Sequence, residues 1–189
     1  MRAGVFVALA VSVSVLVSTV MNDPAKAEHQ GELARIEAQV QSDYTDVATL
    51  SPADYARMRA VSRPALLLDV READEFAVSR IPGAVRVDPG IRTSKFLSEF
   101  ASIASGREVV FYCSVGVRSS KLASRVQAGL KKSGARTVYN LQGGIFRWHN
   151  DNRTLEDAAG ETDRVHPYSD YWGRLVSRQD LLAKSVRKM

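Results

Sequence analysis

The chain has 189 residues, a length that suits one domain with appendages because a single hydrophobic core typically serves about 100 to 200 residues. Apolar residues make up 45% of the sequence and charged residues 25%, a balance that excludes wholesale disorder. The net charge of +5 comes from 26 basic residues scattered among 21 acidic ones and not gathered in runs. Because nucleic-acid binding needs a basic patch or stripe, we expect no nucleic-acid partner.

The first 27 residues have the pattern of a targeting segment. Arg2 supplies a positive charge, residues 3–21 are free of charged side chains, and Ala25-Lys26-Ala27 offers a small-residue cleavage site. We predict a signal peptide over residues 1–27 and a mature chain that begins at Glu28. The apolar run is also long enough to span a bilayer, so an uncleaved anchor that attaches the protein to a membrane is the alternative. Both interpretations predict an exported, periplasmic or otherwise extracytoplasmic protein.

Residues 28–46 are polar with a weak helical period through Leu33, Ile36 and Val40, and we interpret them as a short helix or linker. Residues 47–150 alternate apolar runs with amphipathic stretches, which is typical of a parallel sheet covered by helices. This pattern predicts a three-layer α/β domain with a five-stranded, mainly parallel sheet. The strands are expected at residues 47–50, 65–69, 84–87, 108–112 and 137–141, and the helices at 53–60, 72–78, 93–102 and 119–132, followed by a helical turn after Gly143-Gly144.

Residues 151–189 form a C-terminal extension that is unusually aromatic between His166 and Gly173. We expect it to pack on or beside the domain, with a partner surface as the alternative. The three histidines, His29, His149 and His166, show no metal-ligand spacing.

Cys113 is the single cysteine of the sequence, so it can form neither an internal disulfide nor a metal site with a second thiolate. It follows a predicted strand and precedes a predicted helix, where the unpaired amides and the dipole of the helix favour a thiolate over a thiol. Gly116 allows the loop to bend tightly, and Arg118 supplies a permanent positive charge. These features predict an anion-binding loop around a reactive cysteine, with no metal and no organic cofactor.

The six residues from Cys113 to Arg118 resemble the active-site loop of the rhodanese family. Leu68-Asp69-Val70-Arg71-Glu72 followed by Ile81-Pro82-Gly83-Ala84 is similar to the family's first motif, and Leu141-Gln142-Gly143-Gly144 with Trp148 is similar to its closing motif. The resemblance covers residues 47–150.

The resemblance implies a sulfurtransferase in which Cys113 takes a sulfane sulfur from a donor as a persulfide and passes it to a thiol or another nucleophile. The backbone amides of the loop would bind the substrate, Arg118 would position an anionic donor, and Asp69 and Arg71 would lie beside the same crevice. An equal alternative for Asp69 and Arg71 is a pair that holds loops together. The implied loop residues are Ser114, Val115, Gly116, Val117, Arg118 and Ser119. The implied partners are a small-molecule or protein persulfide donor and a thiol acceptor.

The sequence departs from the family pattern at two positions. Family members often carry Arg after the cysteine and His before the Ile-Pro-Gly turn, where this chain has Ser114 and Arg80. The loss of a charge at position 114 makes thiosulfate a doubtful donor.

Two alternative functions remain at this point. One is a phosphatase or arsenate reductase, although the related loops of those enzymes separate Cys from Arg by five residues and only four separate them here. The other is a non-enzymatic module that binds a partner or carries a persulfide, because a fold does not by itself confer activity.

Overall fold

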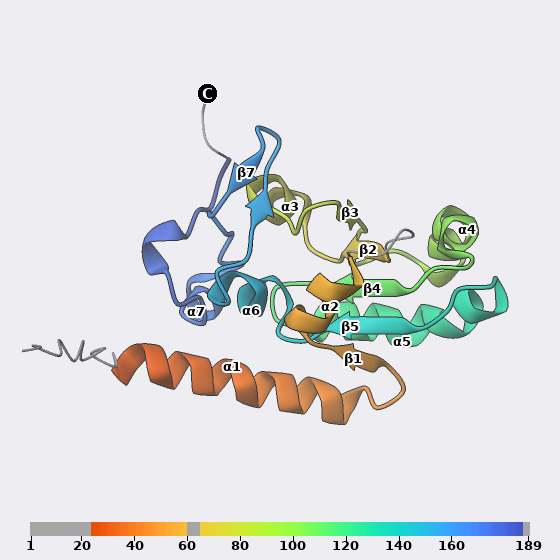
Figure 1. Ribbon diagram of the computed structural model, residues 1–189, viewed down its shortest axis with the longest axis horizontal. Coiled ribbons are helices and arrows are strands. Elements are labelled where there is room, and N and C mark those ends of the chain that lie inside the picture. The colour runs from red at the N-terminus through yellow and green to blue at the C-terminus, as the bar shows by residue number, and fades with distance from the viewer. Residues whose placement is uncertain (1–23, 60–64, 187–189) are drawn as a thin grey trace, which may run out of the picture.

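Five parallel strands form the central sheet of the computed structural model, which describes residues 24–59 and 65–186 (Figure 1). The strands are β1 (Ala48–Leu50), β2 (Leu66–Asp69), β3 (Val85–Arg86), β4 (Val109–Tyr112) and β5 (Val138–Leu141), in the order β1-β5-β4-β2-β3. Each neighbouring pair is parallel. The predicted five-stranded α/β domain is therefore confirmed, and within the described residues its sheet is parallel throughout.

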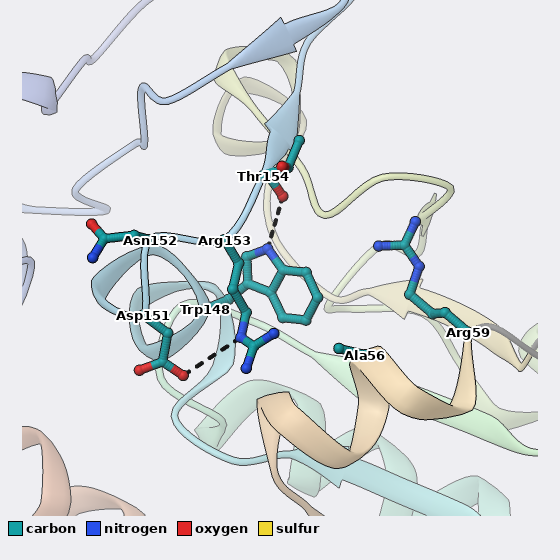
Figure 2. Close-up of a pocket in the computed structure, with 7 residues that line it drawn as sticks. All are labelled: Ala56, Arg59, Trp148, Asp151, Asn152, Arg153 and Thr154. Carbon is teal, nitrogen blue, oxygen red and sulfur yellow. Dashed lines mark hydrogen bonds and ion pairs between the residues drawn. The ribbon is translucent and has the colours of Figure 1, made fainter.

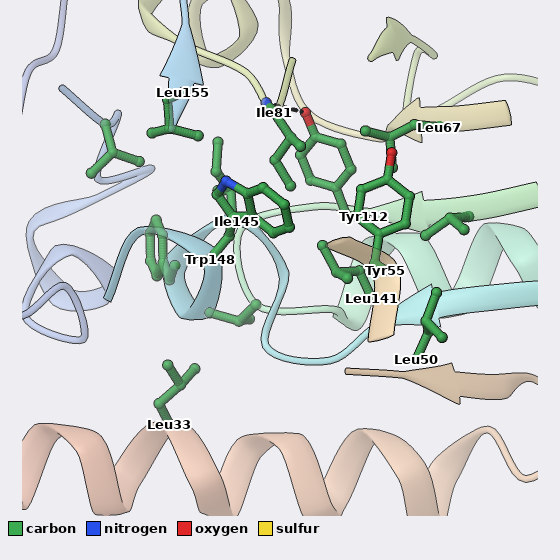
Figure 3. Packing of buried hydrophobic residues seen from close by; sticks show 14 of the residues in the cluster. Leu33, Leu50, Tyr55, Leu67, Ile81, Tyr112, Leu141, Ile145, Trp148 and Leu155 are labelled. Carbon is green, nitrogen blue, oxygen red and sulfur yellow. Dashed lines mark hydrogen bonds between the residues drawn. The ribbon is translucent and has the colours of Figure 1, made fainter. Parts of the chain in front are cut away.

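Helices cover both faces of the sheet. They are α2 (Pro52–Met58), α3 (Ala73–Val78), α4 (Thr93–Ala104), α5 (Val117–Lys132) and α6 (Gly144–Asn150). Alternate residues of each strand point to opposite faces: Leu68 and Phe111 pack with α4 and α5, while Leu67 and Tyr112 pack with α2 and α6 (Figure 3). Because β2 and β4 are buried on both faces, their sequences are apolar throughout except for Asp69 at the end of β2.

The N-terminal segment is one helix, α1 (Pro24–Asp43), so the helix expected within residues 28–46 is present, but it begins earlier and is longer than the short helix that the weak periodicity predicted. Leu33 is fully buried against the domain, and Glu37 is almost fully buried although it is charged. The Glu37 carboxylate accepts hydrogen bonds from Arg147 Nε at 2.7 Å and from Gln142 Nε2 at 3.1 Å. These contacts dock α1 beside α6 (Figure 1). Most of the predicted leader, residues 1–23, lies outside the described residues, among which no helix is long and apolar enough to span a membrane.

The C-terminal extension packs on the same side of the sheet as α6. It contains a hairpin of β6 (Leu155–Glu156) and β7 (Glu161–Thr162), the short helix α7 (Asp170–Gly173) and a 3₁₀ turn at Gln179–Leu181. Val165, Leu175 and Val176 are buried in the cluster that also contains Trp148. The extension thus adds to the core on the face of the sheet that α2 and α6 cover.

Arg80, one of the departures from the family pattern, ties this extension to the domain. Its backbone pairs with that of Glu156 through two hydrogen bonds of 2.8 and 2.9 Å. Its guanidinium contacts the Glu156 carboxylate at 3.1 Å and stacks over the ring of Phe76. An arginine is suited to this position because one planar group can serve an ion pair and an aromatic face together.

Candidate active site

Cys113 lies where β4 ends and shortly before α5 begins, as the sequence predicts. The residue is only 1% exposed, and its Sγ atom accepts a hydrogen bond from the Gly116 amide at 3.2 Å. Gly116 has a left-handed backbone, with φ of 104°, and the Asn140 Nδ2 atom lies 3.0 Å from the place where a Cβ would stand. Only glycine fits this conformation and this space, so Gly116 sets the bend that turns its amide toward the sulfur.

The outer side of the loop is held by the start of α6. The amides of Ile145 and Phe146 donate to the carbonyls of Cys113 and Ser114 at 2.9 and 3.1 Å. A Cβ on Gly144 would lie 2.2 Å from the Cys113 carbonyl oxygen, which explains the second glycine of the closing motif. The loop carbonyls therefore face α6, while the first amides of α5 have no acceptor within their own helix and can serve an anion.

Glu75, on α3, connects three parts of the site. Its carboxylate accepts hydrogen bonds from Arg118 Nη1 at 2.7 Å, from Arg118 Nη2 at 2.9 Å and from the Ser114 hydroxyl at 2.9 Å. It also accepts the Glu72 amide at 3.0 Å at the start of α3. Ser114 in turn accepts a second bond from Arg118 at 3.0 Å. The loop and α3 are thus joined by a two-pronged arginine–carboxylate pair.

These contacts keep both partners charged. Burial alone would raise the pKa of Glu75, but the hydrogen bond and the charge of Arg118 outweigh it and lower that pKa below its usual value. Burial would lower the pKa of Arg118, yet Glu75 and the neighbouring Cys113 raise it. Glu75 is 1% exposed at its side chain, so its negative charge is screened from water and is felt mainly by the site.

Asp69 and Arg71 form a separate, fully buried pair at the end of β2. Arg71 Nη2 and Nε donate to the two carboxylate oxygens of Asp69 at 2.6 and 2.9 Å, and Arg71 also donates to the Ser79 carbonyl at 2.6 Å. Both side chains are completely inaccessible to solvent. The Tyr112 ring lies beside Arg71, and its hydroxyl accepts the Ile81 amide (Figure 3). The Arg71 bonds join the end of β2 to Ser79 after α3, and Tyr112 joins β4 to the Ile-Pro-Gly turn.

A cavity of about 190 Å³ opens beside Cys113. Two of its walls come from the C-terminal extension, in the form of the Tyr168 and Trp172 side chains, and the rest come from the loop itself. The guanidinium of Arg118 lies 4.6 Å from the centre of the Tyr168 ring, a distance that permits a cation–π contact. The complete lining is Cys113, Ser114, Val115, Val117, Arg118, Tyr168 and Trp172.

Tyr168 has a left-handed backbone, with φ of 64°, which is uncommon for a residue with a bulky side chain. Its amide donates to His166 Nδ1 at 3.0 Å, and the Ser169 amide donates to the Pro167 carbonyl at 2.8 Å. Burial lowers the pKa of His166, which favours the neutral imidazole that can accept this bond. A strained residue held over a cavity by its neighbours is typical of functional sites.

The structure brings most of the predicted site residues together. Ser114, Val115, Val117 and Arg118 line the Cys113 cavity. Gly116 and Ser119 do not: the Gly116 amide donates to the Cys113 sulfur, and the Ser119 hydroxyl donates to Asn140 Oδ1 at 2.7 Å. Asp69 and Arg71 do not line the cavity and instead bond to each other. Sequence reasoning missed Glu75, Tyr168 and Trp172 as site residues; the aromatic run from His166 to Gly173 was the one signal that pointed to the last two.

A larger open groove of about 670 Å³ lies elsewhere, between the end of α2 and the loop after α6 (Figure 2). Trp148 forms its floor, donating its indole N–H to the Thr154 carbonyl at 2.8 Å, and Arg153 stacks over the indole. None of the described residues lines both this groove and the cysteine cavity. Across the part of the chain that the structure describes, no group of three or more potential metal ligands is found.

Sheet and site together define a class of α/β protein in which one cysteine occupies a six-residue loop between a central parallel strand and a helix. The chain belongs to the rhodanese-like domain family, whose model matches residues 51–151. The family indicated by the sequence motifs is thereby confirmed.

Curated relatives match the same region. The chain is 37% identical over 90 residues to the uncharacterized protein YqhL of Bacillus subtilis, covering 48% of this chain and 65% of YqhL. It is 31% identical to the probable adenylyltransferase/sulfurtransferase MoeZ of Mycobacterium tuberculosis, covering 53% of this chain and 24% of MoeZ. It is 32% identical to a tRNA uridine(34) hydroxylase of Burkholderia ambifaria, covering 47% of this chain and 31% of the hydroxylase. The chain thus spans less than two thirds of the length of each of these relatives.

Among solved structures, a thiosulfate sulfurtransferase from Pseudomonas aeruginosa superposes with a TM-score of 0.50 at 20% identity. The match covers 82% of this chain and 27% of that one. At this identity the similarity establishes the shared fold.

Proposed function

We propose that the protein is a sulfurtransferase that carries one sulfane sulfur atom on Cys113. The observation that carries the proposal is the Cys113 sulfur, held by the Gly116 amide at 3.2 Å within a six-residue loop that Arg118 closes. This loop can stabilise a negative charge on sulfur through backbone amides and the dipole of α5. The sulfurtransferase description of relatives such as MoeZ supports the same chemistry.

The reaction proceeds in two displacement steps. The Cys113 thiolate attacks the outer sulfur of the donor, the bond between that sulfur and the rest of the donor breaks, and the leaving group keeps its electron pair. In the second step an acceptor thiolate attacks the outer sulfur of the Cys113 persulfide, and the Cys113 thiolate leaves. No oxidant or reductant is consumed. The Gly116 amide, which donates to the Cys113 Sγ atom at 3.2 Å, and the positive end of the α5 dipole stabilise the charge that appears on sulfur in both steps.

The geometry favours this reaction over phosphate transfer. Arg118 is the arginine that a phosphatase loop would direct at its substrate, but both of its terminal nitrogens bond to Glu75. A phosphate dianion would therefore face a neutralised arginine and a buried carboxylate close behind it. A persulfide sulfur carries less charge than a phosphate dianion, so a few amide hydrogen bonds are sufficient to stabilise it.

The test is the intact mass of the purified protein after incubation with sulfane sulfur donors, compared with Cys113→Ser. We expect the wild type to gain one sulfur atom and to lose it when an acceptor thiol is added. The variant should gain none. If no donor adds sulfur to the wild type, the proposal fails and a non-enzymatic binding module becomes the better interpretation.

We also propose that the protein works in an extracytoplasmic compartment. It is supported by Arg2, the apolar run of residues 3–21 and the Ala25-Lys26-Ala27 site. Cleavage after Ala27 would remove the first turn of α1 but would leave Leu33 and Val40, which anchor the helix. Sequencing the N-terminus of the protein recovered from its native cells tests this: a start at Glu28 supports cleavage, and a retained Met1 in a membrane fraction supports the anchor.

A further inference from the structure

We propose that the sulfur donor is the persulfide of a small alkyl thiol, and that Tyr168 and Trp172 select it by forming an aromatic wall opposite Cys113. This inference rests on the proposed sulfurtransferase function and adds the substrate class. Three features of the site carry it: its charge, the character of its lining, and the way the wall is built into the fold.

The charge of the site disfavours a dianionic donor. Arg118 is the one permanently charged side chain among the described residues that line the cavity, and its guanidinium is bonded to Glu75 at 2.7 and 2.9 Å. With Cys113 ionised, the three groups carry a net charge of about −1. A thiosulfate dianion would raise the negative charge to about −3 beside the buried Cys113 and Glu75, whereas a protonated alkyl persulfide leaves it unchanged. The charge pattern therefore favours an organic persulfide, which carries at most one negative charge, over a dianionic donor.

The lining of the cavity suits an apolar body attached to the reacting sulfur. Val115, Val117, Tyr168 and Trp172 supply carbon surface around Cys113. The volume of about 190 Å³ is smaller than the roughly 300 to 1,000 Å³ of sites that take drug-sized ligands. A short alkyl chain of a few carbon atoms, ending in two sulfurs, matches that volume. Burying that chain against the rings would stabilise the bound donor, as it does in apolar ligand sites generally.

The wall is fixed in place by contacts on both of its residues. The Trp172 amide donates to the Ser169 hydroxyl, which caps α7, and Trp172 packs at 5.4 Å, edge to face, on Tyr171. Tyr168 is held in its left-handed conformation by His166 and lies against Arg118. Gly173 allows close approach, because a Cβ there would lie 2.7 Å from the Pro167 side chain. The extension thus presents both rings to the loop in a defined orientation.

The proposed loading step is balanced. The Cys113 thiolate attacks the outer sulfur of R–S–S–H, the S–S bond of the donor breaks, and R–S⁻ leaves with the electron pair and takes a proton from water. Cys113 then holds the persulfide as Cys113–S–S–H, which loses its proton to solvent. The small thiol R–S–H is the product that leaves the cavity past the aromatic wall.

The test compares the rate of sulfur loading on the full-length protein from two donors, 2-hydroxyethyl persulfide and thiosulfate. Wild type, Trp172→Ala, Ile103→Ala and Cys113→Ser are measured by time-resolved intact mass. We expect the alkyl persulfide to load wild type at least about tenfold faster than thiosulfate, and Trp172→Ala to reduce the alkyl rate by about tenfold while changing the thiosulfate rate by less than about twofold. Ile103→Ala is the control, because Ile103 is an exposed apolar residue of α4 that does not line the cavity.

Each other result overturns a defined part of the inference. Faster loading from thiosulfate overturns the substrate class while leaving the sulfurtransferase function intact. Equal loss of both donor rates in Trp172→Ala shows that the ring is needed for folding of the loop and not for selection. Absence of loading from every donor overturns the proposed function itself.

Discussion

The Glu75 carboxylate accepts hydrogen bonds from both terminal nitrogens of Arg118, at 2.7 and 2.9 Å, although the two residues are 43 positions apart in the chain. The carboxylate is almost fully buried, and it also accepts the Ser114 hydroxyl. The Glu75 carboxylate thereby neutralises the positive charge that Arg118 would otherwise give the loop. This relationship sets the chemistry of the cavity as much as the cysteine does.

Replacing Glu75 by Gln should shift the preference of the site toward anionic donors. The amide keeps the size of the side chain and one acceptor oxygen but removes the charge, so Arg118 can turn its charge toward the cavity. We expect the rate of sulfur loading from thiosulfate to rise by about tenfold, equivalent to about 1.4 kcal/mol. Donor-dependent loading rates check this, and circular dichroism confirms that the variant is folded. An unchanged thiosulfate rate in a folded variant would contradict the role given to Glu75.

Replacing Gly144 by Ala should disrupt the active-site loop. A methyl group there would lie 2.2 Å from the Cys113 carbonyl oxygen, and the backbone has φ of 54°. We expect the free energy of unfolding to fall by more than about 2 kcal/mol, with loss of sulfur loading. Gly83→Ala is the matched control, because Gly83 has φ of 80° but no described atom within 4 Å of the place where its methyl group would stand. It should cost only about 1 kcal/mol, and equal losses in the two variants would show that the contact with the loop is unimportant.

Replacing Arg71 by Met should destabilise the fold more than it alters the chemistry. The change leaves the Asp69 carboxylate buried without its arginine, which typically costs about 3 to 5 kcal/mol. The double variant Asp69→Asn with Arg71→Met removes both charges and should recover part of that loss. Urea denaturation of the two single variants and the double variant measures the coupling. A fully stable Arg71→Met protein that has lost sulfur loading would instead assign Arg71 a direct role in substrate binding.

Stability should decline as the solution becomes mildly acidic. Burial lowers the pKa of His149 and of His166 below the ordinary value of 6.5, so the folded protein binds these protons less readily than the unfolded chain. The stability that depends on neutral imidazoles is therefore complete above about pH 6.5 and is lost as the pH falls toward the lower pKa of the folded state. Protonated His166 would also lose its ability to accept the Tyr168 amide.

The measurement is the free energy of unfolding in urea at about pH 7.5 and about pH 5.5. The wild type should lose stability between these values, and His149→Gln with His166→Gln should show a flatter profile. His29→Gln is the control, since His29 lies on the part-exposed surface of α1. A wild-type profile as flat as that of the double variant would contradict the assignment.

Local patterns in the sequence were sufficient to predict the sheet and the loop. Leu66–Asp69 and Val109–Tyr112 are apolar runs of strand length, and Cys113, Gly116 and Arg118 fall where a strand gives way to a helix. The ion pair between Glu75 and Arg118 could not be predicted, because it depends on where α3 packs relative to the loop. The helix α1 was underestimated because its apolar positions are sparse, and its docking depends on the distant partners of Glu32 and Glu37.

The two rings that cover Cys113 come from the last part of the chain, so they leave the ribosome after the sheet, the cysteine and the arginine. Domains generally fold as units, and this last part of the chain also supplies Val165, Leu175 and Val176 to the core, so the domain can complete its folding only after the extension has emerged. Until translation reaches α7, the thiol of the nascent protein is open on the side that Trp172 later closes. Chains that are clipped or stalled before this point would retain the cysteine and lose both its aromatic cover and part of this core.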